Sequence, residues 1–191
     1  MDCVDTGANI ASVQTQPIRG PAGVAAVLKV SSADDHSKNT HLCMAEYQLL
    51  ITPAAAGAPS FVDILSSDGD YSRKIGLRLD GFSPDGKHVF GLLTEGGKTP
   101  LTMLFDYDTA GGGVQLTDLI KLFAHSSARK CSSAIDVIGI APSGALVLES
   151  SPTQQCGAMR RWLLDSARSQ LQPLPQGAST TSLYRSPVDA P

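Results

Sequence analysis

Five side chains able to bind a metal ion lie close together near the start of the sequence. They are two aspartates, two histidines and a cysteine: Asp34, Asp35, His36, His41 and Cys43. Compact structural zinc sites use paired Cys or His residues at short steps, and this spacing does not match any of those patterns. We therefore predict a solvated polar loop that leads into a strand, with no metal or cofactor site.

A serine and a lysine stand in the spacing that pairs a nucleophile with its base in penicillin-binding enzymes. The motif S-x-x-K runs from Ser127 to Lys130, but that chemistry also needs S-x-N and K-T-G elements. Lys98-Thr99 is followed by Pro100, no S-x-N element fits, and no G-x-S-x-G nucleophile elbow occurs. We therefore predict no catalytic residues and expect that the chain is not an enzyme.

Two acidic residues, Asp106 and Asp108, resemble the start of a calcium-binding loop. The alternating pattern of oxygen ligands stops at Ala110, so both are predicted to be hairpin-turn residues. Phe105 and Trp162 lie on apolar segments and are predicted to be core residues.

The four cysteines allow three disulfide pairings. A hairpin turn is predicted at residues 142–144, and the midpoint of Cys131 and Cys156 falls within it. Because residues equidistant from a hairpin turn face each other, Cys131 and Cys156 are predicted to pair in an oxidising compartment. By elimination, Cys3 would pair with Cys43. The alternative is four free thiols in a reducing compartment.

The stretch from Phe82 to Leu119 is read as four short strands in meander order. Pro84-Asp85-Gly86 forms the turn of the first hairpin, because proline fixes φ at one turn position and glycine adopts the positive φ that returns the chain. The following strands are predicted at residues 89–93, 101–107 and 114–116.

The same turn recurs 58 residues later in the sequence. The matching positions are Gly81, Pro84 and Gly86 with Gly139, Pro142 and Gly144. A weaker copy is predicted upstream, with residues 47–52 as a buried strand. In that copy, residues 61–65 and 74–79 would form an outer hairpin around Asp68-Gly69-Asp70.

These motifs resemble a known repeat. The S-P-D-G turn after a hydrophobic-Gly-Phe step, and a hairpin reading Y-D-x-x-x-G, are similar to the WD-repeat-like repeat of Tol-system periplasmic propellers and of prolyl-oligopeptidase-type propeller domains. The resemblance covers roughly residues 45–175. The third copy departs from it, since Ala141 and Ser143 replace the serine and the aspartate of the turn.

The resemblance implies a non-catalytic, β-propeller-like binding or scaffold module with a protein partner. The alternative is a detached accessory domain that gates a secreted hydrolase encoded elsewhere. A periplasmic or secreted location is implied, and a cytoplasmic one is the alternative, because residues 1–5 lack the features of a signal peptide.

The predicted fold is all-β, with about three four-stranded antiparallel meander units in a partial or open propeller. The alternative is a β-sandwich. The domain plan is an irregular arm (1–22), a β-repeat domain (23–175) and a tail rich in Pro, Ser and Thr (176–191). The repeat units are placed at approximately 23–80, 81–118 and 135–174. An insertion at 119–134 carries a short helix capped by Thr117 or Asp118.

The composition limits the classes of partner. The net charge is −3 and aromatic residues make up 5% of the chain, both of which argue against nucleic-acid binding. No apolar run approaches the length of a membrane span. Propellers need about four or more blades to close, so a chain of three units predicts a homodimer, capping by its own segments, or a missing remainder of the ring.

Overall fold

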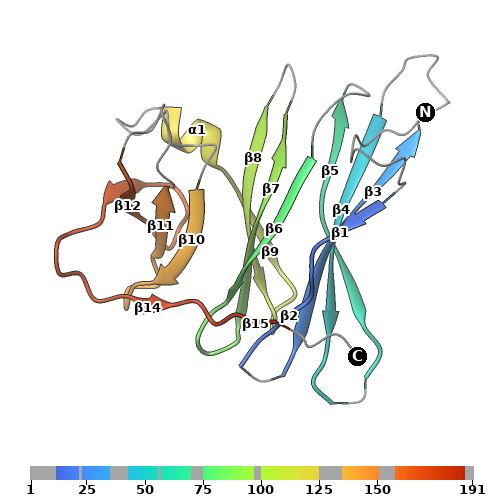
Figure 1. Ribbon diagram of the computed structural model, residues 1–191, viewed down its shortest axis with the longest axis horizontal. Helices are drawn as coiled ribbons and strands as arrows, with labels where there is room; N and C mark the ends of the chain where they lie inside the picture. Colours follow the sequence, from blue (N-terminus) through green and yellow to red (C-terminus); the bar gives the residue numbers. More distant parts are fainter. Residues whose placement is uncertain are drawn as a thin grey trace. The chain divides into compact units, whose positions relative to one another are not determined.

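The computed structural model describes residues 12–21, 23–34, 43–55, 57–69, 75–96, 100–124, 135–150 and 158–187. Their secondary structure comprises strands of two to ten residues and one short helix (Figure 1). The strands are β1 (Ser12–Gln14), β2 (Ile18–Arg19), β3 (Ala25–Asp34), β4 (Cys43–Thr52), β5 (Ser60–Gly69), β6 (Ile75–Phe82), β7 (His88–Glu95), β8 (Leu101–Asp108), β9 (Val114–Asp118), β10 (Ile135–Ile140), β11 (Leu146–Ser150), β12 (Arg160–Leu164), β13 (Leu171–Pro173), β14 (Thr181–Ser182) and β15 (Ser186–Pro187), and the helix is α1 (Leu119–Ala124).

These strands form three sheets within the described part of the chain, and the all-β prediction is confirmed. The first sheet has the order β15-β2-β3-β4-β5, with β1 also paired to β3. The second has the order β6-β7-β8-β9, and the third β13-β12-β11-β10-β14. Consecutive strands are mostly neighbours, as in a meander, and none of the sheets closes into a barrel. Among the described residues no helix has the length and apolar character of a membrane span.

The second sheet follows the predicted meander closely. Its first turn is closed by two backbone bonds, Ser83 N–H to His88 O at 2.9 Å and Gly86 N–H to Ser83 O at 2.8 Å. Gly86 has φ +72°, a conformation that only glycine adopts without strain. The apolar run Val89–Leu93 is buried on both faces of the sheet, as its lack of alternation predicts.

The third sheet repeats this turn. Ala141 N–H donates to Ala145 O at 2.8 Å and Gly144 N–H to Ala141 O at 2.9 Å, and Gly144 has φ +80°. The glycine conformation is therefore kept in both turns, but the closing bond spans Ala141 to Ala145 in the third sheet, one residue fewer than Ser83 to His88 in the second. Trp162 and Phe105, at 5% and 0% exposure, are core residues as predicted.

The predicted outer hairpin of the first copy is wrong. Residues 61–65 lie in β5, which pairs with β4, and Lys74 lies outside the described residues, but residues 75–79 do not pair with β5. They belong to β6, the first strand of the second sheet, which begins at Ile75 rather than at residue 81. Leu79 and Phe82 are fully buried there, which a strand of an exposed outer hairpin would not allow.

The two terminal segments are also more regular than predicted. The arm contributes β1 and β2 to the first sheet, and the tail contributes β14 to the third sheet and β15 to the first. Each of these strands spans three residues or fewer. Such short strands show no alternation that a sequence pattern could reveal, because they are held by backbone pairing.

The short helix predicted in the insertion is confirmed as α1. The carboxylate of Asp118 accepts a bond from Lys121 N–H at 3.0 Å and caps its first turn. Leu119 and Phe123 are buried on one face, and the ring of Phe123 meets Trp162 edge-on, with centroids 5.3 Å apart. The helix is therefore fixed to the third sheet by an aromatic contact.

By its contacts the chain divides into two compact bodies. The first comprises Met1–Leu79, Leu92–Leu101 and Ser186–Pro191, and the second Asp80–Gly91 and Thr102–Arg185. In the first body, Glu95 is buried and accepts hydrogen bonds from the hydroxyls of Tyr47 and Ser67. This carboxylate joins β7 to β4 and β5.

Candidate binding site

Most residues singled out by their chemistry lie outside the described part of the chain. These are Cys3, Asp35, His36, His41, Ser127, Lys130, Cys131 and Cys156. Cys43 begins β4 and stands opposite Asp34 of β3, but the side chains of both are outside the described set. Within the described ranges, no group of three or more His, Cys, Asp and Glu side chains is arranged to hold a metal ion. Both disulfide pairings stay predictions.

Asp108 is a hairpin-turn residue as predicted, but Asp106 is not. Asp108 Oδ1 accepts bonds from Ala110 N–H at 2.8 Å and Gly111 N–H at 3.0 Å. The carboxylate of Asp106 is buried and is bound on both oxygens. His88 Nδ1 lies 2.7 Å from Oδ1, and Arg168 Nη2 lies 2.7 Å from Oδ2. We call these three residues the Asp106 network.

Arg168 reaches Asp106 from the β12–β13 turn. It has φ +58°, an uncommon conformation for a residue with a side chain. Its side chain is only 7% exposed, and Nη1 donates to the carbonyl oxygens of Asp165 at 3.1 Å and Gly144 at 3.4 Å. Its Nε is buried without a hydrogen-bond partner. The turn thus directs the guanidinium group of Arg168 inward, where Asp106 neutralises its charge. This ion pair joins the third sheet to the second.

A hollow of about 330 Å³ lies where the two repeat turns approach each other within the second body. Ser83, Pro84 and Asp85 line it from one turn, and Ala141, Pro142 and Gly144 from the other. His88 lines it as well, with its ring stacked on Phe90 at a centroid distance of 6.0 Å. Two members of the Asp106 network, His88 and Arg168, therefore form part of the wall of this hollow.

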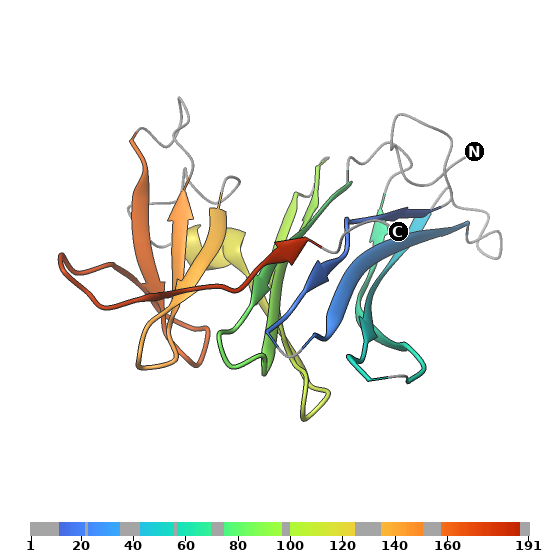
Figure 2. The same cartoon turned by 60° about the horizontal axis from the view of Figure 1, so that its bottom comes forward.

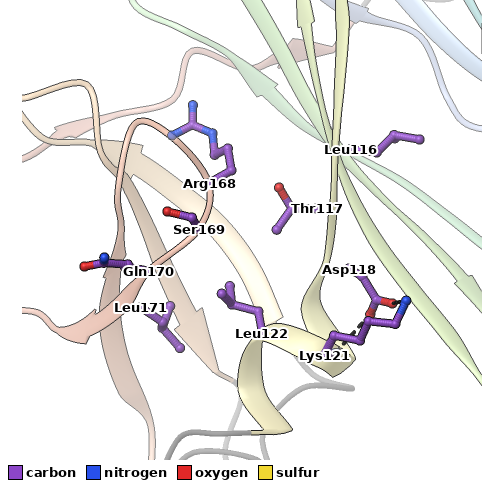
Figure 3. Close-up of a pocket in the computed structure, with 9 residues that line it drawn as sticks. All are labelled: Leu116, Thr117, Asp118, Lys121, Leu122, Arg168, Ser169, Gln170 and Leu171. Atoms are coloured by element: carbon purple, nitrogen blue, oxygen red, sulfur yellow. Dashed lines mark hydrogen bonds and ion pairs between the residues drawn. The ribbon is translucent and has the colours of Figure 1, made fainter.

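A larger, open cleft of about 620 Å³ lies on the other side of Arg168 (Figure 3). Its walls are the end of β9 with α1, and the β12–β13 turn. Figure 3 shows Thr117 and Leu122 facing the space between the walls. The lining is a mixture of apolar, hydroxyl, amide and charged groups: Leu116, Thr117, Asp118, Lys121, Leu122, Arg168, Ser169, Gln170 and Leu171.

The charged groups of the cleft are largely paired. Lys121 Nζ lies 3.3 Å from Asp118 Oδ2, and Arg168 is bound to Asp106. The cleft therefore offers leucine side chains between neutralised charges and hydrogen-bonding groups. This combination can bury apolar side chains of another molecule and satisfy polar groups at their edge.

The wall at residues 165–171 depends on one carboxylate. Asp165 Oδ1 accepts bonds from Gln170 N–H at 2.8 Å and Ser169 N–H at 2.7 Å. These bonds, that of Gln170 first, lower the pKa of Asp165 below its ordinary value of 3.8. A depressed folded-state pKa stabilises the turn above that ordinary value, and the stabilisation is lost as pH falls through the lowered pKa.

We therefore expect acid to loosen this turn. Amide exchange at Ser169 and Gln170 would be followed by NMR from roughly pH 5 to pH 2 and compared with Gly144, whose N–H donates to the carbonyl oxygen of Ala141 in the β10–β11 turn. In Asp165→Asn, the increase in amide exchange at Ser169 and Gln170 on acidification should disappear. Its persistence in that variant would assign the loosening to another group.

Comparisons with protein-family models, with curated proteins and with solved structures found no match to this chain. The site must accordingly be interpreted from its own chemistry.

Sequence reasoning missed His88 and Arg168 and misplaced Asp106. One signal was available: Asp106 interrupts the apolar strand from Leu104 to Tyr107, and a carboxylate in a buried strand requires a partner. The partner could not have been named, because Arg168 lies in another repeat and its turn carries no pattern for an inward-pointing cation.

Proposed function

We propose that this chain is a non-catalytic, β-propeller-like binding or scaffold module that binds a protein partner through the cleft between β9–α1 and the β12–β13 turn. The observation that carries the proposal is the lining of the cleft, in which leucines lie among hydrogen-bonding groups and paired charges. Protein interfaces combine an apolar centre with a polar rim in this way.

The two walls of the cleft are firmly held. Asp118 caps α1, Phe123 packs on Trp162, and Arg168 joins the β12–β13 turn to Asp106. A preformed surface loses little conformational freedom on binding, which favours recognition of a partner. The resemblance of the repeats supports a periplasmic or secreted location for this activity.

The proposal is tested by selecting peptides from a random display library on the immobilised purified chain. Leu122→Arg puts a long charged side chain in the cleft, and Ala110→Arg makes the same change in the exposed β8–β9 turn. Selected peptides should lose about tenfold or more in affinity for Leu122→Arg, the effect of one interface anchor, and bind Ala110→Arg as they bind the unchanged chain.

Two results would contradict the proposal. Equal binding to all three proteins would place peptide recognition outside the cleft. Stoichiometric labelling of the purified chain by a serine-reactive fluorophosphonate, abolished in Ser127→Ala, would overturn its non-catalytic part.

A further inference from the structure

A segment of the tail runs along the edges of two sheets in the second body. Residues 181–185, which we call the strap, pair with β10 through Gly139 opposite Ser182 and Ile140 opposite Thr181. Further along, Phe82 and Tyr184 exchange two backbone bonds of 2.8 Å each. Figure 2 shows the red tail passing the orange strand β10. The strap thus adds a strand to β10 and a bridge to β6.

Glycines make room for the strap at equivalent positions of the two repeats. A Cβ atom on Gly139 would lie 2.6 Å from Thr181 O, and one on Gly81 would lie 2.9 Å from Tyr184 O. Both distances are too short for a real side chain. Each glycine therefore admits another backbone at close range. We call the edges of β6 and β10 at Gly81 and Gly139, where the strap lies, the glycine groove.

The strap is held mainly by its backbone. Thr181, Ser182, Tyr184 and Arg185 are exposed, with Tyr184 at 42%, and Leu183 is half-buried. Recognition through main-chain bonds, with one apolar side chain for specificity, is how proteins bind extended peptides at a sheet edge. Of its five side chains, only that of Leu183 would leave a half-buried position if the strap detached.

We propose that the glycine groove is a binding site for an extended peptide segment of a partner protein, and that the strap is a competing ligand supplied by the chain itself. The partner segment carries an apolar residue at the place of Leu183 and N–H groups at the places of Leu183 and Tyr184, so proline is excluded there. This site is separate from the cleft and goes beyond the function proposed above.

The strap itself is the observation that identifies this occupant. Its N–H groups donate to the sheets, Leu183 to Ile138 O at 3.3 Å and Tyr184 to Phe82 O. Its tether keeps it at a high local concentration, on the order of millimolar for a short flexible linker. A partner segment must therefore bind better than the strap, or be brought close by a second contact.

The test uses the full chain with a specific protease site inserted between Gly177 and Ala178. The probe is a fluorescent synthetic peptide of residues 178–185, which omits β15, and binding is measured by anisotropy before and after cutting. We expect saturable binding after cutting, and binding roughly tenfold or more weaker before it, because the tether then favours the strap. The matched control peptide is N-methylated at Leu183 and Tyr184, which removes the two donors and keeps the side chains, and it should not bind.

Gly139→Ala provides the second arm, because its added methyl group collides with the strap while no positive φ is required there. It should weaken peptide binding with circular dichroism unchanged. Equal binding of the methylated peptide, no exchange after cutting, or unfolding on cutting would each overturn the proposal, the last two by showing a permanent structural strand. A dimer of the uncut chain that the peptide dissociates would assign the groove to a second copy instead of a foreign partner.

Discussion

Arg168→Met is expected to lower the free energy of unfolding by about 3–5 kcal/mol, the usual effect of removing one partner from a buried ion pair. Arg168 and Asp106 are each 7% exposed, so the remaining carboxylate would stay buried with His88 as its remaining partner in the Asp106 network. The carbonyl oxygens of Gly144 and Asp165 would lose a donor as well. Methionine is similar in length to the aliphatic part of arginine, and its backbone is as strained as that of arginine at φ +58°. The substitution therefore measures the contribution of the guanidinium group.

The measurement is equilibrium unfolding in urea, with two companion variants. Arg168→Met combined with Asp106→Leu removes both charges and should recover most of the loss, because an uncompensated buried charge is worse than an apolar pair. Arg168→Lys keeps the charge without the planar guanidinium group. Its free energy of unfolding should lie between those of the unchanged chain and Arg168→Met. A loss below about 1 kcal/mol in Arg168→Met, typical of exposed pairs, would show that the network is solvated.

Phe123→Ala is expected to cost about 3–5 kcal/mol, the range for removing a buried aromatic side chain. Phe123 is fully buried and meets Trp162 edge-on. The cavity would lie between α1 and the third sheet and could close only if the helix shifted. Trp162 is the sole tryptophan of the chain, so its fluorescence should move to longer wavelength as water reaches the ring.

Leu122→Ala is the matched control on the same helix. Leu122 is only partly buried and lines the open cleft, so its loss should cost roughly 1 kcal/mol and leave the tryptophan emission unchanged. Equal costs for the two variants, or an unchanged spectrum in Phe123→Ala, would contradict the packing of Phe123 on Trp162.

The sequence reveals those parts of the fold that are encoded within a few residues. Pro84 and Gly86 favour their turn by backbone conformation, and neighbouring side chains add hydrogen bonds within it. Asp118 specifies the start of α1 by its capping side chain. The repeat of the turn at Pro142 and Gly144 follows from the same local chemistry. These predictions succeed because nothing distant is needed to satisfy them.

The candidate site was far less predictable, because its groups meet only after the sheets have formed. Asp106 and Arg168 are joined across 62 positions of sequence, and no alternation or motif links them. The assignment of residues 74–79 to an outer hairpin failed for a related reason. A strand pattern shows that a segment is extended but does not say which neighbour it pairs with.

The pairing of β15 with β2 sets an order for assembly during protein synthesis. Arg19 pairs with Ser186 and Ile18 with Pro187, so the first sheet gains this strand only after all the residues between Arg19 and Ser186 have been translated. At about 5–20 residues per second this delay is roughly ten seconds or more. Throughout it, β2 of the nascent chain presents an unpaired edge, the kind of surface at which neighbouring chains on one messenger can associate.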